Sequence, residues 1–238
     1  MYKITLEHIT HSYGDKEVLQ DLSCSFEQGK ITCLLGPSGC GKTTVLRLVA
    51  GLEKPENGVV KINGTVVSYN GTILIPPHQR KIGFVFQDLA LWPHFTVYDN
   101  IAFGLKEKKG KNIKEKVAEL LDLFGISDKA PKYPHQLSGG QKQMVAIARS
   151  MAMQPEILLM DEPLANIDTH LKENILNHLL KIQKQQKFTI LYVTHDHREA
   201  MNTGDEIIVM NAGKIEAAGS KEAVSCSSSE FVRSFIKI

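Results

Sequence analysis

A strand, a glycine-rich loop and a helix follow one another near the N-terminus, and they constrain the fold more than any other feature of the chain. Apolar residues at 31–35 indicate a buried strand, and those at 44–50 indicate a helix. The loop between them satisfies the pattern G-x-x-x-x-G-K-[ST] at every position and reads Gly36-Pro37-Ser38-Gly39-Cys40-Gly41-Lys42-Thr43. A strand that leads through such a loop into a helix predicts an α/β fold.

The loop has the chemistry of a phosphate-binding site. Its glycines let backbone N–H groups turn inward without a Cβ clash, and the helix directs the positive end of its dipole at the same point. Lys42 can bring a full charge to the outer phosphates of a nucleotide triphosphate, and the Thr43 hydroxyl can hold Mg²⁺. The alternative is an ordinary glycine-rich turn, and Cys40 stands at a position that needs no chemistry. The expected nucleotide contacts are Gly36, Pro37, Ser38, Gly39, Cys40, Gly41, Lys42, Thr43 and Thr44.

Composition narrows the class of protein. The 238 residues are 42% hydrophobic, which is enough for a sizeable core, and 28 basic against 26 acidic side chains give a net charge of +2. This balance argues against a nucleic-acid surface, so no nucleic-acid partner is expected. Apolar runs fall far short of the roughly 20 residues of a spanning helix, and no signal-peptide pattern opens the chain. These two observations predict a soluble protein. The four cysteines show no C-x-x-C spacing, so neither a zinc site nor a disulfide framework is indicated and a reducing cytosol fits.

The first third of the chain has the pattern of β-strands. Alternating residues at 3–9 and a run at 18–26 predict an antiparallel β layer. Turn residues on both sides of 59–62 indicate a hairpin, and 82–86 is predicted to be a short buried strand. Gln87 follows directly after that strand.

From residue 96 to about residue 150 the periodicity is helical. Thr96 is a candidate N-cap for a helix over 97–105, and a second helix is expected to end before Gly125. A third helix follows 137–140, and its apolar face consists of Val145, Ile147, Ala148 and Met151. These helices predict a helical insert in the α/β core.

Strands and helices alternate again in the last third of the chain. Residues 157–160 predict a buried strand that ends at Asp161-Glu162-Pro163, Asp168 is placed to cap the next helix, and 188–194 is another strand. The order strand, helix, strand predicts a parallel, doubly wound core. The tail is expected to contain a hairpin around 211–214, a flexible hinge at 225–229 and an amphipathic helix from about Glu230.

Several further sequence motifs show which family of nucleotide-binding proteins the phosphate loop belongs to. They are Leu137-Ser138-Gly139-Gly140-Gln141, the pair Asp161-Glu162, Gln87 after its strand and His195 after another strand. With these motifs, residues 2–218 resemble the nucleotide-binding subunit of an ATP-binding cassette (ABC) transporter. An unrelated kinase with the same phosphate loop has no use for 137–141.

The resemblance implies a single ABC ATPase domain over 1–238. Its expected fold is α/β, with a P-loop NTPase core whose mostly parallel sheet is flanked by helices, an antiparallel β subdomain and a helical subdomain. The expected division assigns 1–86 and 155–220 to the RecA-like core and β layer, 87–154 to the helical subdomain and 221–238 to the tail.

The same resemblance assigns roles to residues near the phosphates. Asp161 ends a buried strand, where a carboxylate can hold a metal through its water shell. By resemblance Glu162 orients the attacking water, His195 touches the γ-phosphate, Gln87 contacts Mg²⁺ and Tyr13 stacks on adenine. The alternatives are a solvent-facing acidic pair, a structural histidine, a loop glutamine and a core or turn tyrosine. The expected catalytic residues are therefore Glu162 and His195, and the expected metal ligands of the bound Mg²⁺ are Thr43, Gln87 and Asp161.

A second anion site is expected where the signature motif precedes its helix, because backbone N–H groups and a serine hydroxyl meet there. By resemblance Ser138, Gly139, Gly140 and Gln141 serve the ATP of another subunit, and Asp168 lies in a loop that links the two sites. Hydrolysis is then expected to need two ATP molecules in a head-to-tail pair, formed with a second copy or with a paralogous ATPase. Met144 and His197-Arg198 depart from the commonest family pattern, which leaves open how tightly the signature helix and the segment after His195 are braced.

Segments 75–80, 86–97 and 100–105 are similar to bacterial and archaeal importer subunits for sugars, polyamines, ferric iron, sulfate or molybdate. In that group the ATPase lies at the cytoplasmic face of the membrane and energises solute import through a separate permease, with a solute-binding protein as an indirect partner. An apolar groove for a short permease helix is expected from Leu89, Leu91, Trp92 and Phe95, for which core packing is the alternative.

Other members of the family remain as alternatives. One is a soluble ABC ATPase that acts on nucleic acid or ribosomes, and another is the detached ATPase subunit of an exporter. The further C-terminal β domain that many importer subunits carry is expected to be absent from a chain that ends at Ile238. The sequence does not specify the cargo.

Overall fold

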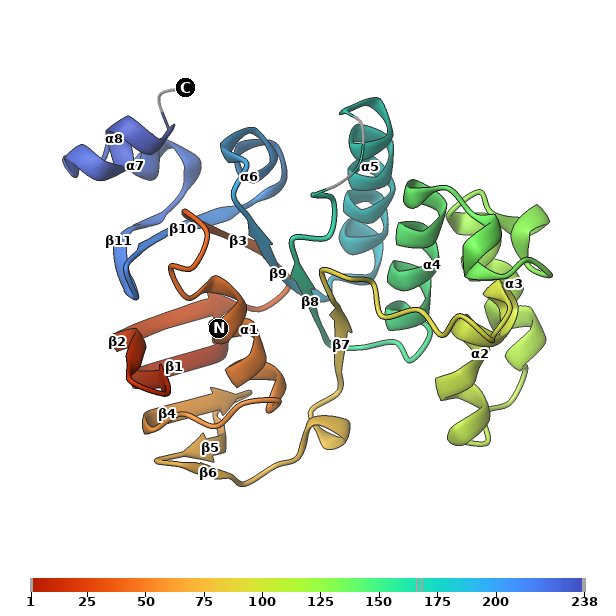
Figure 1. Ribbon diagram of the computed structural model, residues 1–238, viewed down its shortest axis with the longest axis horizontal. Coiled ribbons are helices and arrows are strands. Elements are labelled where there is room, and N and C mark those ends of the chain that lie inside the picture. Colours follow the sequence, from red (N-terminus) through yellow and green to blue (C-terminus); the bar gives the residue numbers. More distant parts are fainter. Residues whose placement is uncertain (1, 166, 168, 237–238) are drawn as a thin grey trace.

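Two β-sheets and the helices around them make up the fold, in a computed structural model that describes residues 2–165, 167 and 169–236 (Figure 1). The first sheet is antiparallel and consists, in spatial order, of β2 (Lys16–Glu27), β1 (Tyr2–Tyr13), β4 (Asn57–Ile62), β5 (Thr65–Tyr69) and β6 (Thr72–Ile73). The second sheet consists of β11 (Lys214–Gly219), β10 (Glu206–Asn211), β3 (Ile31–Leu35), β9 (Thr189–Thr194), β8 (Ile157–Asp161) and β7 (Ile82–Val85).

The second sheet is parallel except for the β10–β11 pair, and this confirms the predicted α/β core. Every residue of β3, β8 and β9 is buried, as continuous apolar runs in a parallel sheet predict. Because β3, β9, β8 and β7 run in one direction, their carboxyl ends lie at the same edge. The phosphate loop, His195, the pair Asp161-Glu162 and Gln87 all emerge at that edge.

Helix α1 (Lys42–Ala50) joins the two sheets. Its residues Val45, Leu46 and Val49 are fully buried and belong to the same apolar cluster as Leu6 of β1 and Leu159 of β8. Burying each such side chain contributes about 1.5–3 kcal/mol to folding. The helix that begins at the phosphate loop is therefore held on both sides.

Arg80 fixes the other end of α1. Its buried guanidinium donates to the carbonyls of Leu48 at 3.1 Å and Val49 at 2.8 Å, and also to the carbonyl of Val67 in β5 at 3.0 Å. Gly51 leaves room for it, since a Cβ at that position would lie 2.5 Å from the guanidinium carbon. One side chain thus connects the carboxyl end of α1 to the antiparallel sheet.

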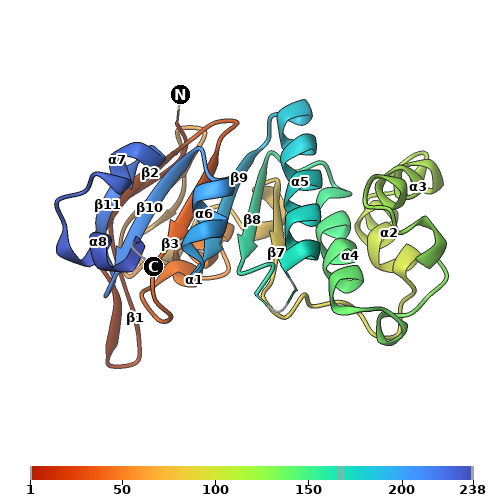
Figure 2. The ribbon, with the colours of Figure 1, turned by 90° about the horizontal axis from the view of Figure 1, so that it is seen from above.

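The predicted helical segment contains α2 (Val97–Glu107), α3 (Ile113–Leu123) and α4 (Gly139–Met151), and α5 (Thr169–Gln186) lies between α4 and the parallel sheet (Figure 2). The Thr96 side chain accepts from the backbone N–H of Asp99, which confirms the predicted N-cap. Gly125 has φ of 64° just after the C-cap of α3, which confirms the predicted end. Short 3₁₀ helices are present at Pro77–Gln79, Ser127–Lys129 and Pro134–Gln136.

The remaining helices are α6 (His197–Thr203), α7 (Lys221–Ser225) and α8 (Glu230–Ile236). The hairpin of β10 and β11 and the helix from Glu230 confirm the expectations for the tail. Ser225, the first residue of the hinge expected at 225–229, belongs instead to α7, a five-residue helix that Ser220 caps. Residues 226–229 connect α7 to α8, and their flexibility stays a prediction. Among the described residues, no helix is both long enough and apolar enough to cross a bilayer.

Candidate nucleotide-binding site

A cleft of about 480 Å³ opens where the phosphate loop meets the carboxyl edge of the parallel sheet. The predicted site residues that line it are Tyr13, Ser38, Gly39, Gly41, Lys42, Thr43, Thr44, Gln87 and Glu162. Gly36, Pro37 and Cys40 complete the loop without lining the cleft. Lys16, Val18 and Arg47 also line it and were not predicted. Lys16 could have been found from the hairpin, because it pairs with Tyr13 across β1 and β2.

Two glycines of the phosphate loop, Gly36 and Gly41, are required by close contacts with neighbouring residues. A Cβ on Gly36 would lie 2.2 Å from the carbonyl oxygen of Met210, and a Cβ on Gly41 would lie 2.6 Å from a methyl of Leu19. Gly41 has φ of 105° and occupies the N-cap of α1, where no side chain among the described residues caps the helix. The first N–H groups of α1 are consequently available to a phosphate.

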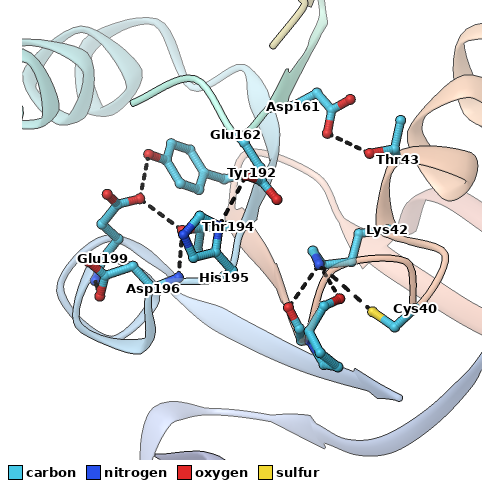
Figure 3. Close-up of polar contacts among 12 residues, drawn as sticks. Cys40, Lys42, Thr43, Asp161, Glu162, Tyr192, Thr194, His195, Asp196 and Glu199 are labelled. Atoms are coloured by element: carbon cyan, nitrogen blue, oxygen red, sulfur yellow. Dashed lines mark hydrogen bonds and ion pairs between the residues drawn. The ribbon is translucent and has the colours of Figure 1, made fainter. Parts of the chain in front are cut away.

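Lys42 is buried at the base of the cleft, and its ammonium is held by its own loop (Figure 3). Its Nζ donates to the carbonyls of Gly36 and Pro37, both at 2.8 Å, and lies 3.8 Å from Cys40 Sγ. Burial raises the pKa of the Cys40 thiol. A neutral thiol is a poor nucleophile, in agreement with the interpretation that Cys40 needs no chemistry.

Two of the three residues expected to hold a metal meet at the end of β8. The Thr43 hydroxyl donates to Asp161 Oδ1 at 2.8 Å, and Gln87 lines the same cleft. Burial raises the pKa of Asp161, so a nearby cation would compensate the cost of its charge. No cluster of three or more His, Cys, Asp or Glu that could hold a metal occurs among the described residues. A hydroxyl, a carboxylate and an amide oxygen fit Mg²⁺, which usually takes few protein oxygens together with phosphate and water.

Glu162 and His195 face each other beside this group, one from the end of β8 and one from the end of β9 (Figure 3). His195 Nδ1 lies 3.0 Å from Glu162 Oε2. Glu162 has φ of 43°, which is an uncommon backbone conformation for a residue other than glycine. Its backbone N–H donates to the carbonyl oxygen of Val193 at 3.1 Å. Strained residues that the surroundings hold in place are typical of functional sites.

Tyr13 lies at the outer wall of the cleft. It is 43% exposed, and its ring packs edge-to-face on buried His11 with the centroids 4.9 Å apart. This exposure does not fit a core tyrosine. Stacking of adenine on Tyr13 stays a prediction.

The segment after Gln87 is held by an arginine that sequence reasoning missed. Arg149, in the last turn of α4, donates to the carbonyl of Ala90 at 2.6 Å and to that of Leu89 at 2.8 Å. Both of these residues have positive φ, and the guanidinium carbon lies 4.9 Å from the ring centroid of Trp92. An arginine within a long helix carries no local signal of such a role.

The signature residues lie outside the cleft of their own chain. Ser138 caps α4 by accepting from the N–H of Gln141 at 3.3 Å, and the Gln141 side chain accepts from the N–H of Ser138 at 3.0 Å. Gly139 borders a smaller cavity next to Gln87 and Glu162. Gly140 packs against Leu171, which a Cβ at position 140 would meet at 2.1 Å. Asp168 lies outside the described residues.

The fold and the cleft together define a nucleotide-binding protein with a phosphate loop and a carboxylate pair. Residues 19–165 match the family model described as ABC transporter. The chain belongs to the ABC transporter family.

Relatives support this assignment. The chain is 43% identical over 227 residues to the trehalose/maltose import ATP-binding protein MalK of Thermococcus litoralis, with 94% of this chain and 61% of that protein covered. It is 41% identical over 227 residues to the sulfate/thiosulfate import ATP-binding protein CysA of Ralstonia nicotianae, with 93% and 60% covered. The chain therefore spans about 60% of the length of the curated relatives it matches.

Solved structures are similar over more of their length. The dimeric post-hydrolysis structure of the ATP-binding cassette MJ0796 bound to ADP and Pi has a TM-score of 0.80 and 31% identity, with 91% of this chain and 98% of that chain covered. The cbiO1 protein of Clostridium perfringens, part of an ABC transporter complex, has a TM-score of 0.83 and 30% identity, with 98% and 94% covered.

Proposed function

We propose that this chain is a Mg²⁺-dependent ATPase subunit that energises solute import through a separate membrane permease. The observation that carries the proposal is a pair of contacts that each have one member in the cleft, Thr43 with Asp161 and Glu162 with His195. We assign the first contact to the metal and the second to the outer phosphate.

The chain's own groups account for the chemistry of hydrolysis. Lys42 and the first N–H groups of α1 bind the phosphates, and Mg²⁺, when bound, neutralises charge that develops on them. Glu162 orients a water whose oxygen attacks the γ-phosphorus as the bond to ADP breaks, and the proton leaves by way of this carboxylate or the phosphate. His195 holds the Glu162 side chain in position. The cost of the Glu162 backbone conformation is consistent with such a task.

Two copies are proposed to enclose two ATP molecules. Ser138 and Gln141 do not line the cleft of their own chain, and the N-terminus of α4 is proposed to be the second anion site, because helix N-termini favour anions. A head-to-tail pair brings this helix end to the ATP of the partner. The MJ0796 cassette, which is similar in fold, was captured as a dimer with ADP and Pi. The partner is a second copy or a paralogous ATPase, and Asp168 is proposed to lie near the junction.

A membrane partner is proposed to dock next to Gln87. Trp92 is half-buried and packs on Phe103, with ring centroids 4.6 Å apart, and Phe103 is 37% exposed. Phe95 completes this aromatic cluster. An apolar patch of this kind suits a short helix of a permease subunit. We therefore place the chain at the cytoplasmic face of the membrane, with a solute-binding protein as an indirect partner.

The cargo is proposed to be set by other subunits. Relatives of similar identity are named for import of trehalose and maltose, sulfate, ferric ions and spermidine. Chains that share this fold thus serve solutes of different charge and size. Co-purification with a permease would separate the importer from an exporter subunit or a soluble ABC ATPase.

Replacing Glu162 by Gln tests the catalytic assignment. Glu162→Gln is expected to bind ATP as the wild type does, to lose hydrolysis by a factor of about 10²–10⁴ and to stabilise the ATP-bound pair. The measurements are phosphate release, nucleotide affinity and mass in solution with ATP. Glu173→Gln, an exposed position on α5, is the control and should leave all three unchanged. Unchanged turnover in Glu162→Gln would refute the role given to this carboxylate.

A further inference from the structure

A buried carboxylate outside the cleft connects the His195 segment to helix α5. Glu199, in α6, is 8% exposed. Its Oε2 accepts from the Tyr192 hydroxyl at 3.1 Å and from Thr194 Oγ1 at 2.9 Å, and its Oε1 lies 2.6 Å from the ammonium of Lys172 in α5. Figure 3 shows Glu199 facing Tyr192 and Thr194 on the side away from Lys42.

The pairing with Lys172 is what makes this buried charge tolerable. An isolated carboxylate in the interior costs several kcal/mol, and an ion pair offsets that cost only where further hydrogen bonds satisfy both groups. The Lys172 side chain is 19% exposed, so it is also largely removed from water. Replacing a buried ion pair by apolar residues of similar volume is often neutral or stabilising. The pair and its hydrogen bonds are therefore weak evidence for added stability, but they define the geometry between α5 and α6.

Thr194 connects Glu199 to the backbone on both sides of His195. Its hydroxyl donates to Glu199 and accepts from the N–H of Asp196 at 3.0 Å, so the residues on both sides of His195 are fixed by one side chain. The His195 side chain itself is 54% exposed and is therefore weakly restrained by packing. Its position against Glu162 depends on the backbone that Thr194 and Asp196 hold.

Lys172 connects Glu199 to the segment of the chain that follows Glu162. The chain leaves Glu162 and enters α5 at Thr169, and Lys172 lies in the first turn of that helix. A small cavity borders Glu162, His195, Lys172 and Glu199 together, so the two pairs are neighbours in space. The Glu199–Lys172 pair thus ties together the two segments that supply Glu162 and His195.

We propose that Glu199 is a positioning residue for ATP hydrolysis, which holds His195 against Glu162 through Thr194 and through its ion pair with Lys172. The inference rests on the proposed ATPase function. Glu199 touches neither nucleotide nor metal in this scheme and transfers no proton. Displacement of catalytic groups by about 1 Å can cost up to about 10²-fold in rate, so loss of the tie should lower turnover without weakening ATP binding.

The test compares variants by kcat, KM for ATP and stability in urea. Thr194→Val and Lys172→Met are expected to lower kcat about tenfold or more, with KM within about twofold of wild type because neither residue lines the nucleotide cleft. Lys172→Arg keeps the charge and should retain kcat. Thr203→Val is the matched control, since Thr203 is also a buried threonine, at the C-terminal end of α6, but its hydroxyl has no hydrogen-bond partner among the described residues.

A double variant separates positioning from stability. Lys172→Met with Glu199→Gln removes both buried charges, so it should fold more stably than Lys172→Met alone and still turn over slowly. If the double variant hydrolyses ATP at the wild-type rate, or if kcat in all variants follows the folded fraction alone, the inference is wrong. A wild-type chain without ATPase activity would overturn the proposed function and this inference together, whereas an active wild type with unaffected variants would overturn the inference alone.

Discussion

At the scale of single residues, the phosphate loop shows how a buried cation is kept ready for a ligand. The Lys42 ammonium donates to two carbonyls of its own loop, and the loop can bend around it because Gly36 and Gly41 lack a Cβ. ATP must replace these carbonyl acceptors with phosphate oxygens. A hydrogen bond to a charged group contributes about 1.5–3 kcal/mol. Lys42 is therefore expected to bind the charged phosphate oxygens of ATP more strongly than the neutral carbonyls of its own loop.

Replacement of Lys42 by Ala is expected to weaken ATP binding by a factor of about 10–100 or more, because the charge-assisted contacts to the phosphates are lost. Titration calorimetry would measure the affinity. Lys54→Ala, at an exposed position after α1, should bind ATP as the wild type does. Equal affinities for wild type and Lys42→Ala would exclude a direct phosphate contact by this lysine.

At the scale of elements, α4 has a functional neighbour at each end. Its N-terminus, capped by Ser138, is proposed to face the ATP of a partner, and Arg149 in its last turn holds the segment after Gln87. The helix connects these two ends through 13 residues, so a shift at one end is expected to move the other. A permease that binds next to Gln87 is therefore expected to move the Ser138 end of α4, which is proposed to face the partner's ATP.

An arginine at the cap of α4 is expected to block pairing while leaving ATP binding intact. Ser138→Arg, made in the Glu162→Gln background, places a bulky cation at the helix end that the partner's ATP must reach. Analytical ultracentrifugation with ATP should find monomers, whereas the Glu162→Gln parent forms pairs. Ser220→Arg is the control, because it also removes a serine N-cap, that of α7. ATP-dependent pairs of Ser138→Arg would contradict the head-to-tail arrangement.

The sequence predicts elements well where one local pattern decides them. The phosphate loop, the parallel strands and the Thr96 cap have such patterns, and all are present as predicted. Helix α7 was missed because five residues are too few for a periodicity. The strands predicted at 3–9 and 18–26 are longer, since β1 and β2 continue to the turn at Gly14.

Contacts between distant segments could not be predicted in this way. Glu199 and Lys172 are 27 positions apart, and Arg149 is about 60 positions from its carbonyl partners. Each of these charged residues resembles a solvent-exposed helix residue in the sequence, and only the packing of the helices reveals its partner. The division of the chain at residues 87 and 154 likewise stays a prediction.

At the scale of the whole molecule, an ion-pair group complements α1 in joining the two sheets. Glu156, just before β8, contacts Lys3 of β1 at 2.5 Å and Lys81, just before β7, at 3.0 Å. These lysines, Lys3 first, lower the pKa of Glu156 to about 2. The Glu156 side chain is 39% exposed, so solvent screening makes the stabilisation smaller than this shift alone suggests.

The sign of the pH dependence follows from the lowered pKa. Because Glu156 has a pKa of about 2 in the folded chain and 4.5 as its ordinary value, its contribution to stability is complete above about pH 4.5 and is lost as the pH falls toward 2. Glu156→Gln is expected to lower the urea midpoint at pH 7, and the difference from wild type should shrink between pH 5 and about pH 3. The exposed α3 variant Glu119→Gln is the control. A difference that is constant with pH would show that the pair contributes nothing through charge.

The contacts of Lys42 with its own loop also bear on how the cycle ends. In the proposed ATPase, these two carbonyls are available to the ammonium when ADP departs, so no unpaired charge is left in the interior. For the proposed ATPase, the nucleotide affinity then measures the difference between two states in which the ammonium is hydrogen-bonded. Such a loop is expected to bind nucleotide less tightly and to release ADP more readily than one that leaves the ammonium unpaired.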